Sequence, residues 1–367
     1  MKIIHCADLH LDSKISANLD NLKAKERRRE LVDTYTRMVD FAREKSCSAI
    51  LIAGDMFDTK TVSAFTKNAV LDTIRNNPGI DFYYLKGNHD HDSLTDELTD
   101  IPDNLHLFKD EFTEYPLSAS GKTVLYGAEL TEEKSGLIQN SFSPDPSKIN
   151  IVMLHGQTAE YTGNDRAEIV NLKAFKNKGV DYLALGHIHE YKREALDGYG
   201  VFCYPGCLEG RGFDECGEHG FVLLDIDEDA GTVKDTFIPF SKRKLFLIDV
   251  DISDLITSTE VLNSVKTGIN ESGATGKDLL KIVLKGETDV DSECDTDYIL
   301  NSVKDDHYHV KIKNESTVRV DYGSFMLDKS LKGEFVRLCS ADDFISDAEK
   351  GEIIKLGLSV IAGGKIE

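Results

Sequence analysis

Short apolar runs alternate with stretches of helical periodicity along the first two-thirds of the chain. Each run has the length of a buried strand. The runs lie at residues 3–6, 50–53, 82–85, 124–128, 149–154, 182–185, 201–204 and 221–226. Strands that alternate with helices, followed by closely spaced strands, predict a layered α/β or α+β domain built on sheets.

Three segments between these runs are expected to be helical. Residues 22–45 place apolar side chains three or four positions apart from Leu31 to Ala42, which predicts a long amphipathic helix. Ser63 is a favourable N-cap for a second helix. A third helix fits residues 170–178.

A domain boundary is expected near residues 239–244, where the pattern changes. Beyond it, strand, helix, strand, helix and strand fit residues 245–252, 258–271, 279–285, 295–304 and 310–313. Such a compact α+β unit has roughly half the size of a typical domain. We therefore assign a first domain to residues 1–240, a small second domain to 241–330 and a short tail to 331–367, with a helix at about 342–356.

The composition is ordinary for a soluble protein, with 40% hydrophobic and 29% charged residues. The 7 cysteines form no C-x-x-C pair and are expected to be reduced thiols. Residues 1–6 lead directly into a strand without a signal peptide, and no window has the apolar length of a membrane span. We expect a cytoplasmic protein with no membrane partner.

The net charge of −22 is unfavourable for a nucleic-acid partner, because phosphate binding depends on Lys and Arg. Bound divalent cations add positive charge that this sum omits, and one face can differ from the whole surface. Residues 286–306 are strongly acidic, so DNA is not expected to lie there. The charge therefore leaves a substrate other than DNA open.

Polar side chains that can bind metal follow five of the apolar runs, where α/β folds place their ligand sites. They are Asp8 and His10 after residues 3–6, Asp55 after 50–53, Asn88 and His89 after 82–85, His155 after 149–154, and His187 and His189 after 182–185. Besides His89, the set has two carboxylates, four imidazoles and one amide. This mixture suits Mn²⁺, Fe or Zn²⁺ better than Mg²⁺ or Ca²⁺, which prefer oxygen ligands.

Seven ligands are too many for one ion with open positions, and they suit two ions that share a bridging carboxylate. Two ions about 3.5–4 Å apart stabilise the attacking and leaving oxygens of an in-line displacement. Gly54, Gly87 and Gly186 precede ligands, where a tight turn or close backbone approach is needed. A single histidine at a strand end is more often structural, so the prediction depends on the joint occurrence of the motifs.

The motifs Asp-x-His, Gly-Asp-x-x-Asp, Gly-Asn-His-Asp, His-Gly and Gly-His-x-His, in this order, resemble those of the calcineurin-like metallophosphoesterase superfamily. The resemblance covers roughly residues 1–225 and implies an α/β fold, a four-layer α/β/β/α sandwich of two packed sheets flanked by helices. It also implies a role for each motif residue. One ion would be held by Asp8, His10 and His189, and the second by Asn88, His155 and His187. Asp55 would bind both ions. His89 would protonate the leaving oxygen, and Asp90 would orient His89.

Three segments resemble SbcD-type and YhaO-like DNA repair exonuclease subunits: residues 7–13, 54–58 and 204–215. Cys207 stands where these nucleases usually have Ser, and Asp58 stands where many relatives have His, so no role carries over to Asp58. The resemblance implies Mn²⁺-dependent exonuclease or endonuclease cleavage of DNA in double-strand break repair or recombination. It further implies a small α+β cap domain, a homodimer and an SMC-like coiled-coil ATPase partner of the SbcC type.

Apolar residues of the tail, Phe335 and Leu338 among them, offer a face that docks on such a partner or packs on the second domain. Arg211 is a candidate substrate-binding residue, and a salt bridge to Glu209 or Asp214 is the alternative. The run 27–29 is the densest basic cluster, for which a solvated helix face is favoured over contact with DNA.

Two other functions stay open. A phosphatase or small-molecule phosphodiesterase on the same dimetal site accords with the negative charge. A non-catalytic scaffold for the ATPase accords with the partner, but it has no need of the full ligand set or of His89.

Overall fold

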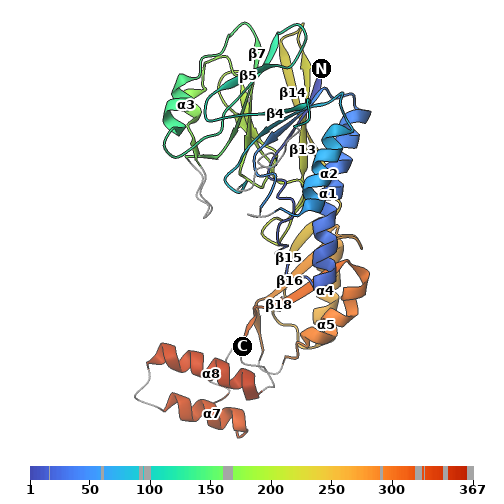
Figure 1. Ribbon diagram of the computed structural model, residues 1–367. Coiled ribbons are helices and arrows are strands. Elements are labelled where there is room, and N and C mark those ends of the chain that lie inside the picture. Colours follow the sequence, from blue (N-terminus) through green and yellow to red (C-terminus); the bar gives the residue numbers. More distant parts are fainter. Residues whose placement is uncertain are drawn as a thin grey trace. The chain divides into compact units, whose positions relative to one another are not determined.

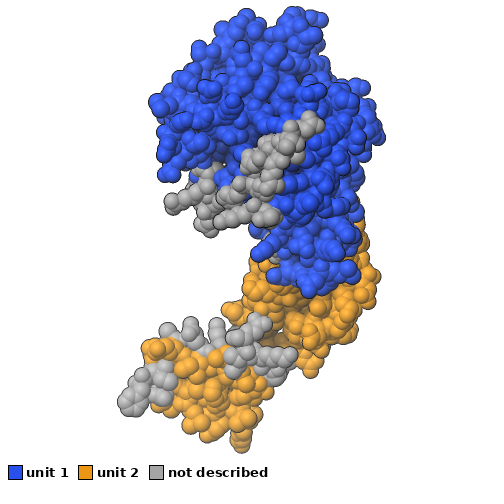
Figure 2. Space-filling view, in the orientation of Figure 1, with its two compact units in different colours: residues 1–244 blue, residues 245–367 orange. Residues whose placement is uncertain are grey.

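The computed structural model describes residues 1–15, 17–58, 62–90, 94, 101–159, 168–289, 292–318, 325, 327–341 and 346–361. The chain divides into two compact units, Met1–Lys244 and Leu245–Glu367, which Figure 2 shows in different colours. Among the described helices, none combines the length and the apolar character that crossing a bilayer requires.

The first unit contains two six-stranded sheets, each with parallel strands at its centre. In order across the first sheet, the strands are β14 (Thr232–Pro239), β13 (Gly220–Asp227), β1 (Lys2–Cys6), β2 (Ala49–Ala53), β3 (Asp81–Leu85) and β4 (Leu105–Leu107). Across the second sheet they are β11 (Lys192–Ala195), β12 (Val201–Tyr204), β10 (Tyr182–Gly186), β7 (Ile149–His155), β6 (Thr123–Gly127) and β5 (Thr113–Pro116). Strands β13, β14, β5 and β11 pair antiparallel, so both sheets are mixed.

The first unit has three apolar cores, and successive side chains of a strand point alternately into the cores on its two faces. Ile50 and Ile52 of β2 face α1 (Asn21–Glu44) and α2 (Ala64–Arg75), whereas Leu51 faces the second sheet. On the second sheet, Met153 faces the first sheet and Val152 faces the outer core, which includes Ile138 of α3 (Ser135–Ser141). Figure 1 shows α1 and α2 on one side of this arrangement and α3 on the other. The first unit is therefore a mixed α/β structure built on two face-to-face sheets.

Both helices that cover the first sheet begin at side-chain caps. Asp20 accepts hydrogen bonds from the backbone N–H groups of Leu22 and Lys23 and starts α1. Ser63 accepts from the N–H of Thr66 and starts α2, which confirms the predicted cap. The apolar side of α1, including Tyr35 and Met38, lies in the core.

The second unit has a three-stranded parallel sheet, β15 (Leu245–Asp251), β16 (Leu279–Lys285) and β18 (His309–Asn314). Helices α4 (Ser258–Ser272) and α5 (Thr296–Val303) pack on it around a separate core that includes Val265, Ile282 and Ile299. A short turn of 3-10 helix (Lys304–Asp306) and the pair β17 (Glu287–Thr288) and β19 (Thr317–Val318) complete this part. The predicted order of strands and helices is confirmed.

Two helices follow, α7 (Leu331–Ser340) and α8 (Asp347–Ile361). They pack on each other through Val336, Ile354 and Leu358. Only one helix was expected in the tail, and four residues of its range, 342–345, lie outside the described residues.

The helix expected at residues 170–178 is wrong. Ile169 and Val170 form the short strand β9, which pairs with β8 (Gln157–Thr158), and a single 3-10 turn follows at Leu172–Ala174. The side chain of Asn171 caps this turn, and Asn177 has a φ of 58° that helical residues do not adopt. Local capping therefore outweighed the helical spacing of the apolar residues.

Candidate metal centre

All five motifs lie at the carboxyl ends of parallel strands. Strands β1, β2 and β3 are neighbours in the first sheet, and β7 and β10 are neighbours in the second. Because the loop after β1 hydrogen-bonds to the loop after β2, through Asp8 N to Gly54 O (3.1 Å) and His10 N to Asp55 O (2.9 Å), the first two motifs are held together. The strand ends thus bring seven predicted ligands from distant parts of the chain to one place.

Asp8, His10 and His189 form the first cluster, in which one ligand atom from each lies within 4.8 Å of the others. His189 donates its Nδ1 proton to Glu215 Oε1 at 2.8 Å, so its Nε2 carries a lone pair. Asp58 Oδ1 lies 3.5 Å from His10 Nδ1 and favours the proton there, which leaves a lone pair on His10 Nε2. The two Nε2 atoms face each other at 3.0 Å, where either a shared proton or a bound metal ion satisfies both lone pairs.

The second cluster consists of Asp55, His155 and His187, again with ligand atoms within 4.8 Å of one another. His155 Nδ1 donates to the carbonyl of Ala53 at 2.9 Å, so a neutral ring carries its lone pair on Nε2. That Nε2 atom lies 2.9 Å from Asn88 Oδ1 and 3.4 Å from Asp55 Oδ2, which are both acceptors. Three lone pairs thus converge on one point, as they do around a metal ion.

Asp55 lies between the two clusters. Its Oδ1 accepts a hydrogen bond from the N–H of His89 at 2.9 Å. Its Oδ2 is buried without a hydrogen bond among the described residues, and it lies 3.4 Å from His155 Nε2 and 4.0 Å from His10 Nε2. A carboxylate oxygen that faces one imidazole of each cluster has the position of a bridging ligand.

The pKa values of residues in the two clusters also indicate that bound cations would be favourable. Burial raises the pKa of Asp8 above its ordinary value, and a nearby positive charge would lower it again. Burial alone would lower the pKa of His155, but the negative charge of the nearby Asp55 raises that pKa to about 9. In the absence of metal, a proton on His155 therefore supplies the positive charge that a divalent ion supplies when it binds.

Four of the clustered residues have backbone conformations that side chains other than glycine rarely adopt. The φ angles are 52° for Asp8, 43° for His10, 52° for Asp55 and 106° for His187. Residues held in such conformations are concentrated at functional sites, where the surrounding fold offsets the strain. The backbone conformations of these residues therefore support a functional site at the ends of the strands.

Two glycines allow the clusters to approach each other. A Cβ on Gly186 would lie 1.8 Å from Ala53 O, and a Cβ on Gly87 would lie 2.1 Å from Asp55 Oδ1. No larger residue fits at either position without moving a ligand or the backbone next to it. This agrees with the close approach that the sequence predicted for the glycines before ligands.

His89 lies beside the first cluster, with its ring centroid 5.4 Å from that of His10. Its Nδ1 is 3.0 Å from Asp58 Oδ1, and its side chain is 32% exposed. Asp90, which was expected to orient His89, instead accepts hydrogen bonds from the N–H groups of Phe57 and Gly87, both at 2.9 Å. The structure thus places Asp58, and not Asp90, against the His89 ring.

Arg211 connects the carboxylates that face these histidines. Its Nη2 lies 2.7 Å from Glu215 Oε1 and its Nη1 lies 3.4 Å from Asp58 Oδ2. Its backbone N–H donates to Glu215 Oε2 at 2.7 Å. The sequence offered a salt bridge to Glu209 or Asp214 as the alternative to substrate binding, and the structure shows Arg211 paired with Glu215 and Asp58.

Glu215 and Asp58 are the residues that the sequence did not reveal. Glu215 stands 26 positions after His189 and ends the segment 204–215 that resembles the nucleases, but that resemblance assigns it no role. In the structure it is buried and holds both His189 and Arg211. Burial alone would raise the pKa of Glu215, but these partners hold it well below its ordinary value.

Two sheets whose parallel strand ends present adjoining Asp and His clusters are consistent with a dimetal phosphoesterase site. Comparison with known proteins agrees, because the model of the family called "Calcineurin-like phosphoesterase" matches residues 1–191. The chain belongs to this family.

The chain also resembles curated relatives over most of its length. It is 29% identical to the "Uncharacterized metallophosphoesterase YhaO" of Bacillus subtilis (strain 168) over 307 residues, which are 78% of this chain and 72% of the relative. It is 27% identical to the "DNA double-strand break repair protein Mre11" of Saccharolobus solfataricus over 383 residues, covering 97% of this chain and 94% of the relative. The Mre11 protein of Methanopyrus kandleri is 26% identical, over 79% of this chain and 69% of the relative.

Proposed function

We propose that the chain is a DNA nuclease subunit of the SbcD or YhaO type, which hydrolyses phosphodiester bonds with two metal ions in double-strand break repair or recombination. The observation that carries the proposal is the pair of adjoining clusters with Asp55 between them and His89 at their edge. Similarity to two Mre11 proteins supports DNA as the substrate.

The geometry of the two clusters supports a ligand set for each ion. Asp8, His10 and His189 would hold one ion, and Asn88, His155 and His187 would hold the second, with Asp55 shared. When bound, the two ions would lower the pKa of a water and neutralise charge on the phosphoryl oxygens. A donor set that mixes imidazoles with carboxylates suits Mn²⁺, Fe or Zn²⁺. The resemblance to SbcD-type and YhaO-like nucleases favours Mn²⁺ among them.

His89 is the group that we assign to protonate the departing sugar oxygen. The carboxylate of Asp58 lies 3.0 Å from its Nδ1, so the ring is oriented for proton transfer. The ring is partly exposed beside the first cluster, where a substrate can reach it. Asp90 contributes by binding backbone N–H groups of two motif loops, which fixes the positions of Asp55 and His89.

Arg211 and Glu215 act through other residues. Glu215 fixes the tautomer of His189, and Arg211 neutralises Glu215 and Asp58, which would otherwise repel each other and the substrate. We therefore assign Arg211 to the positioning of the site, with contact to the substrate phosphate as the alternative. Its side chain is 13% exposed, which leaves limited surface for a ligand.

The same proposal extends to partners. The two helices of the tail bury one apolar face against each other and leave Leu331 and Leu338 exposed by 71% and 65%. Exposed leucines on a helical pair suit the coiled coil of an SbcC-type ATPase. The second unit would act as the cap that helps to select DNA, and the chain would form a homodimer.

The test is cleavage of end-labelled duplex DNA with Mn²⁺, with bis(p-nitrophenyl) phosphate as a second substrate. We expect Mn²⁺-dependent shortening from the ends by the wild type, and a loss of about 100-fold or more in the His89→Asn variant. An SbcC-type ATPase is expected to raise cleavage by the wild type, but not by the Leu331→Glu/Leu338→Glu variant.

Each rival function gives a different result in this assay. Turnover of the small phosphodiester without cleavage of DNA, with or without the ATPase, would support the phosphodiesterase alternative. Binding of the ATPase with no turnover of either substrate would support the scaffold.

A further inference from the structure

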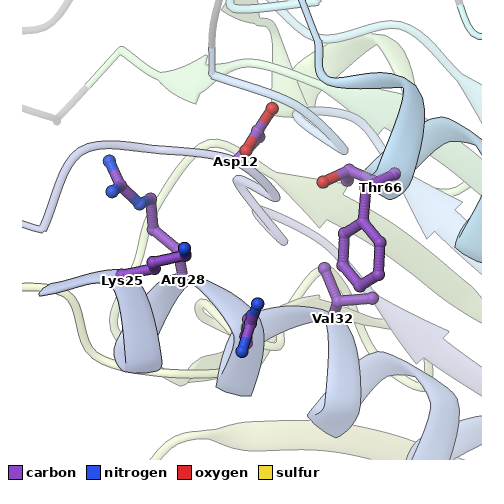
Figure 3. A pocket seen from close by; sticks show the side chains of 7 residues that line it. Asp12, Lys25, Arg28, Val32 and Thr66 are labelled. Carbon is purple, nitrogen blue, oxygen red and sulfur yellow. The ribbon is translucent and has the colours of Figure 1, made fainter. Parts of the chain in front are cut away.

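An open pocket of about 440 Å³ lies between α1 and α2 in the first unit. Figure 3 shows Lys25, Arg28 and Val32 of α1 along one side of it, and Asp12 and Thr66 on the opposite side. Arg29 and Phe65 also line it. The predicted metal ligands are not among the lining residues, so the pocket is a separate feature of the surface.

Three cations meet at this pocket because of their spacing on α1. Arg28 and Arg29 follow Lys25 by three and four residues, so both lie on the same helix face as Lys25. All three are exposed, and among the described residues none of them forms an ion pair. The charges are therefore available to an anionic ligand.

Arg27, in the same basic run, points the other way. It is 1% exposed and pairs with Glu30 at 2.6 Å and with Glu209 at 3.2 Å. The sequence favoured a solvated helix face for the run 27–29, and the structure buries Arg27 while it leaves Arg28 and Arg29 exposed. Arg27 anchors the helix, whereas the other two arginines line the pocket.

The pocket adjoins the metal centre through the loop after β1. Asp12 lies two residues after His10, so their Cα atoms are at most about 7 Å apart. Asp12 Oδ2 accepts a hydrogen bond from the N–H of Ser63 at 2.6 Å, which ties this loop to the start of α2. A polymer whose phosphate lies at the metal centre can therefore place a neighbouring phosphate at the pocket.

We propose that this basic pocket binds a DNA phosphate next to the phosphodiester at the metal centre, an inference that rests on the proposed function. Phosphate binding needs positive charge, and the net charge of the chain is −22. The local positive charge at the pocket comes from Lys25, Arg28 and Arg29. Phe65 is 64% exposed at the first turn of α2 and offers an aromatic face to a sugar or base. The class of ligand is a phosphodiester strand rather than a small phosphate ester, which would occupy the metal centre alone.

The proposal is tested by the salt dependence of DNA binding. A duplex oligonucleotide is titrated with the full chain in Mn²⁺, and His89→Asn in every variant prevents cleavage. We expect the Arg28→Gln/Arg29→Gln variant to bind at least fivefold more weakly at low salt. We also expect the slope of log K against log[salt] to become shallower by about 0.9 for each phosphate that the variant no longer neutralises.

A matched control removes two exposed arginines from the same pair of helices. Arg43 and Arg75 are 61% and 41% exposed, lie in the last turns of α1 and α2, and do not line the pocket. The Arg43→Gln/Arg75→Gln variant is expected to keep the original slope. Equal slopes and affinities for both double variants would overturn the proposal.

The two proposals fail in different ways. With His89 intact, Arg28→Gln/Arg29→Gln is expected to hydrolyse bis(p-nitrophenyl) phosphate at the wild-type rate and to show a raised KM for DNA only. If the wild type cleaves DNA and the pocket variant matches the control, only the pocket is wrong. If the wild type neither binds nor cleaves DNA, both the nuclease proposal and the pocket proposal are wrong.

Discussion

Each imidazole of the first cluster faces a carboxylate on the side away from the predicted ion. Glu215 holds His189 at 2.8 Å, Asp58 lies 3.5 Å from His10, and Arg211 joins the two carboxylates. A carboxylate that accepts the Nδ1 proton fixes the ring orientation and makes Nε2 a better donor to a metal. The affinity of the first site therefore depends on residues that do not touch the ion.

We expect the Glu215→Gln variant to bind the first Mn²⁺ ion about 10–100-fold more weakly, because His189 loses the charge that fixes its tautomer. The measurement is a calorimetric titration of metal-free protein with Mn²⁺. The matched control is Glu190→Gln, which removes an exposed carboxylate next to His189 in the chain. Equal weakening by both substitutions would show that only net charge matters, and the positioning role would be wrong.

At the scale of elements, the centre depends on how closely the ends of β2 and β10 approach each other. Gly186 ends β10, and a Cβ there would overlap the carbonyl of Ala53, which ends β2 and accepts the His155 proton. The same carbonyl, Ala53 O, therefore sets both the distance between the two sheets and the orientation of His155 in the second cluster.

We expect Gly186→Ala to lower the free energy of unfolding by about 1–3 kcal/mol, because the two strand ends must separate. It should also weaken Mn²⁺ binding by displacing His155. Gly136→Ala is the control, since Gly136 lies in α3 with open space around the added Cβ and should gain up to about 1 kcal/mol. Urea unfolding of the metal-free proteins measures both, and a Gly186→Ala variant as stable as the wild type would contradict the contact.

The sequence predicted the central strands because they are buried on both faces and are continuously apolar. It missed the edge strand β14, because exposed and half-buried residues alternate along this strand and leave no apolar run. It placed the ligand motifs at strand ends correctly, since a motif is local in sequence. It could not place Glu215 against His189, because that contact depends on a loop whose course only the fold determines.

At the scale of the whole molecule, acidic charge and a polyanionic substrate are compatible only if cations are concentrated where the substrate lies. The net charge is −22, whereas the loop after β1 contributes Asp8 and His10 to the first cluster and Asp12 to the basic pocket, so the predicted ions and the exposed cations lie near the same loop. The acidic second unit, with carboxylates throughout residues 286–306, would then keep DNA off other surfaces. Strong salt dependence of DNA binding follows from this arrangement.

The central claim, two ions that share Asp55, is tested most directly by the Mn²⁺ content of the desalted, metal-loaded protein, determined by elemental analysis. We predict two ions per wild-type chain and at most one in the Asp55→Asn variant, with an unchanged far-ultraviolet circular dichroism spectrum as evidence that the variant is folded. A wild type that retains one ion or none, or an Asp55→Asn variant that retains both, would contradict the account.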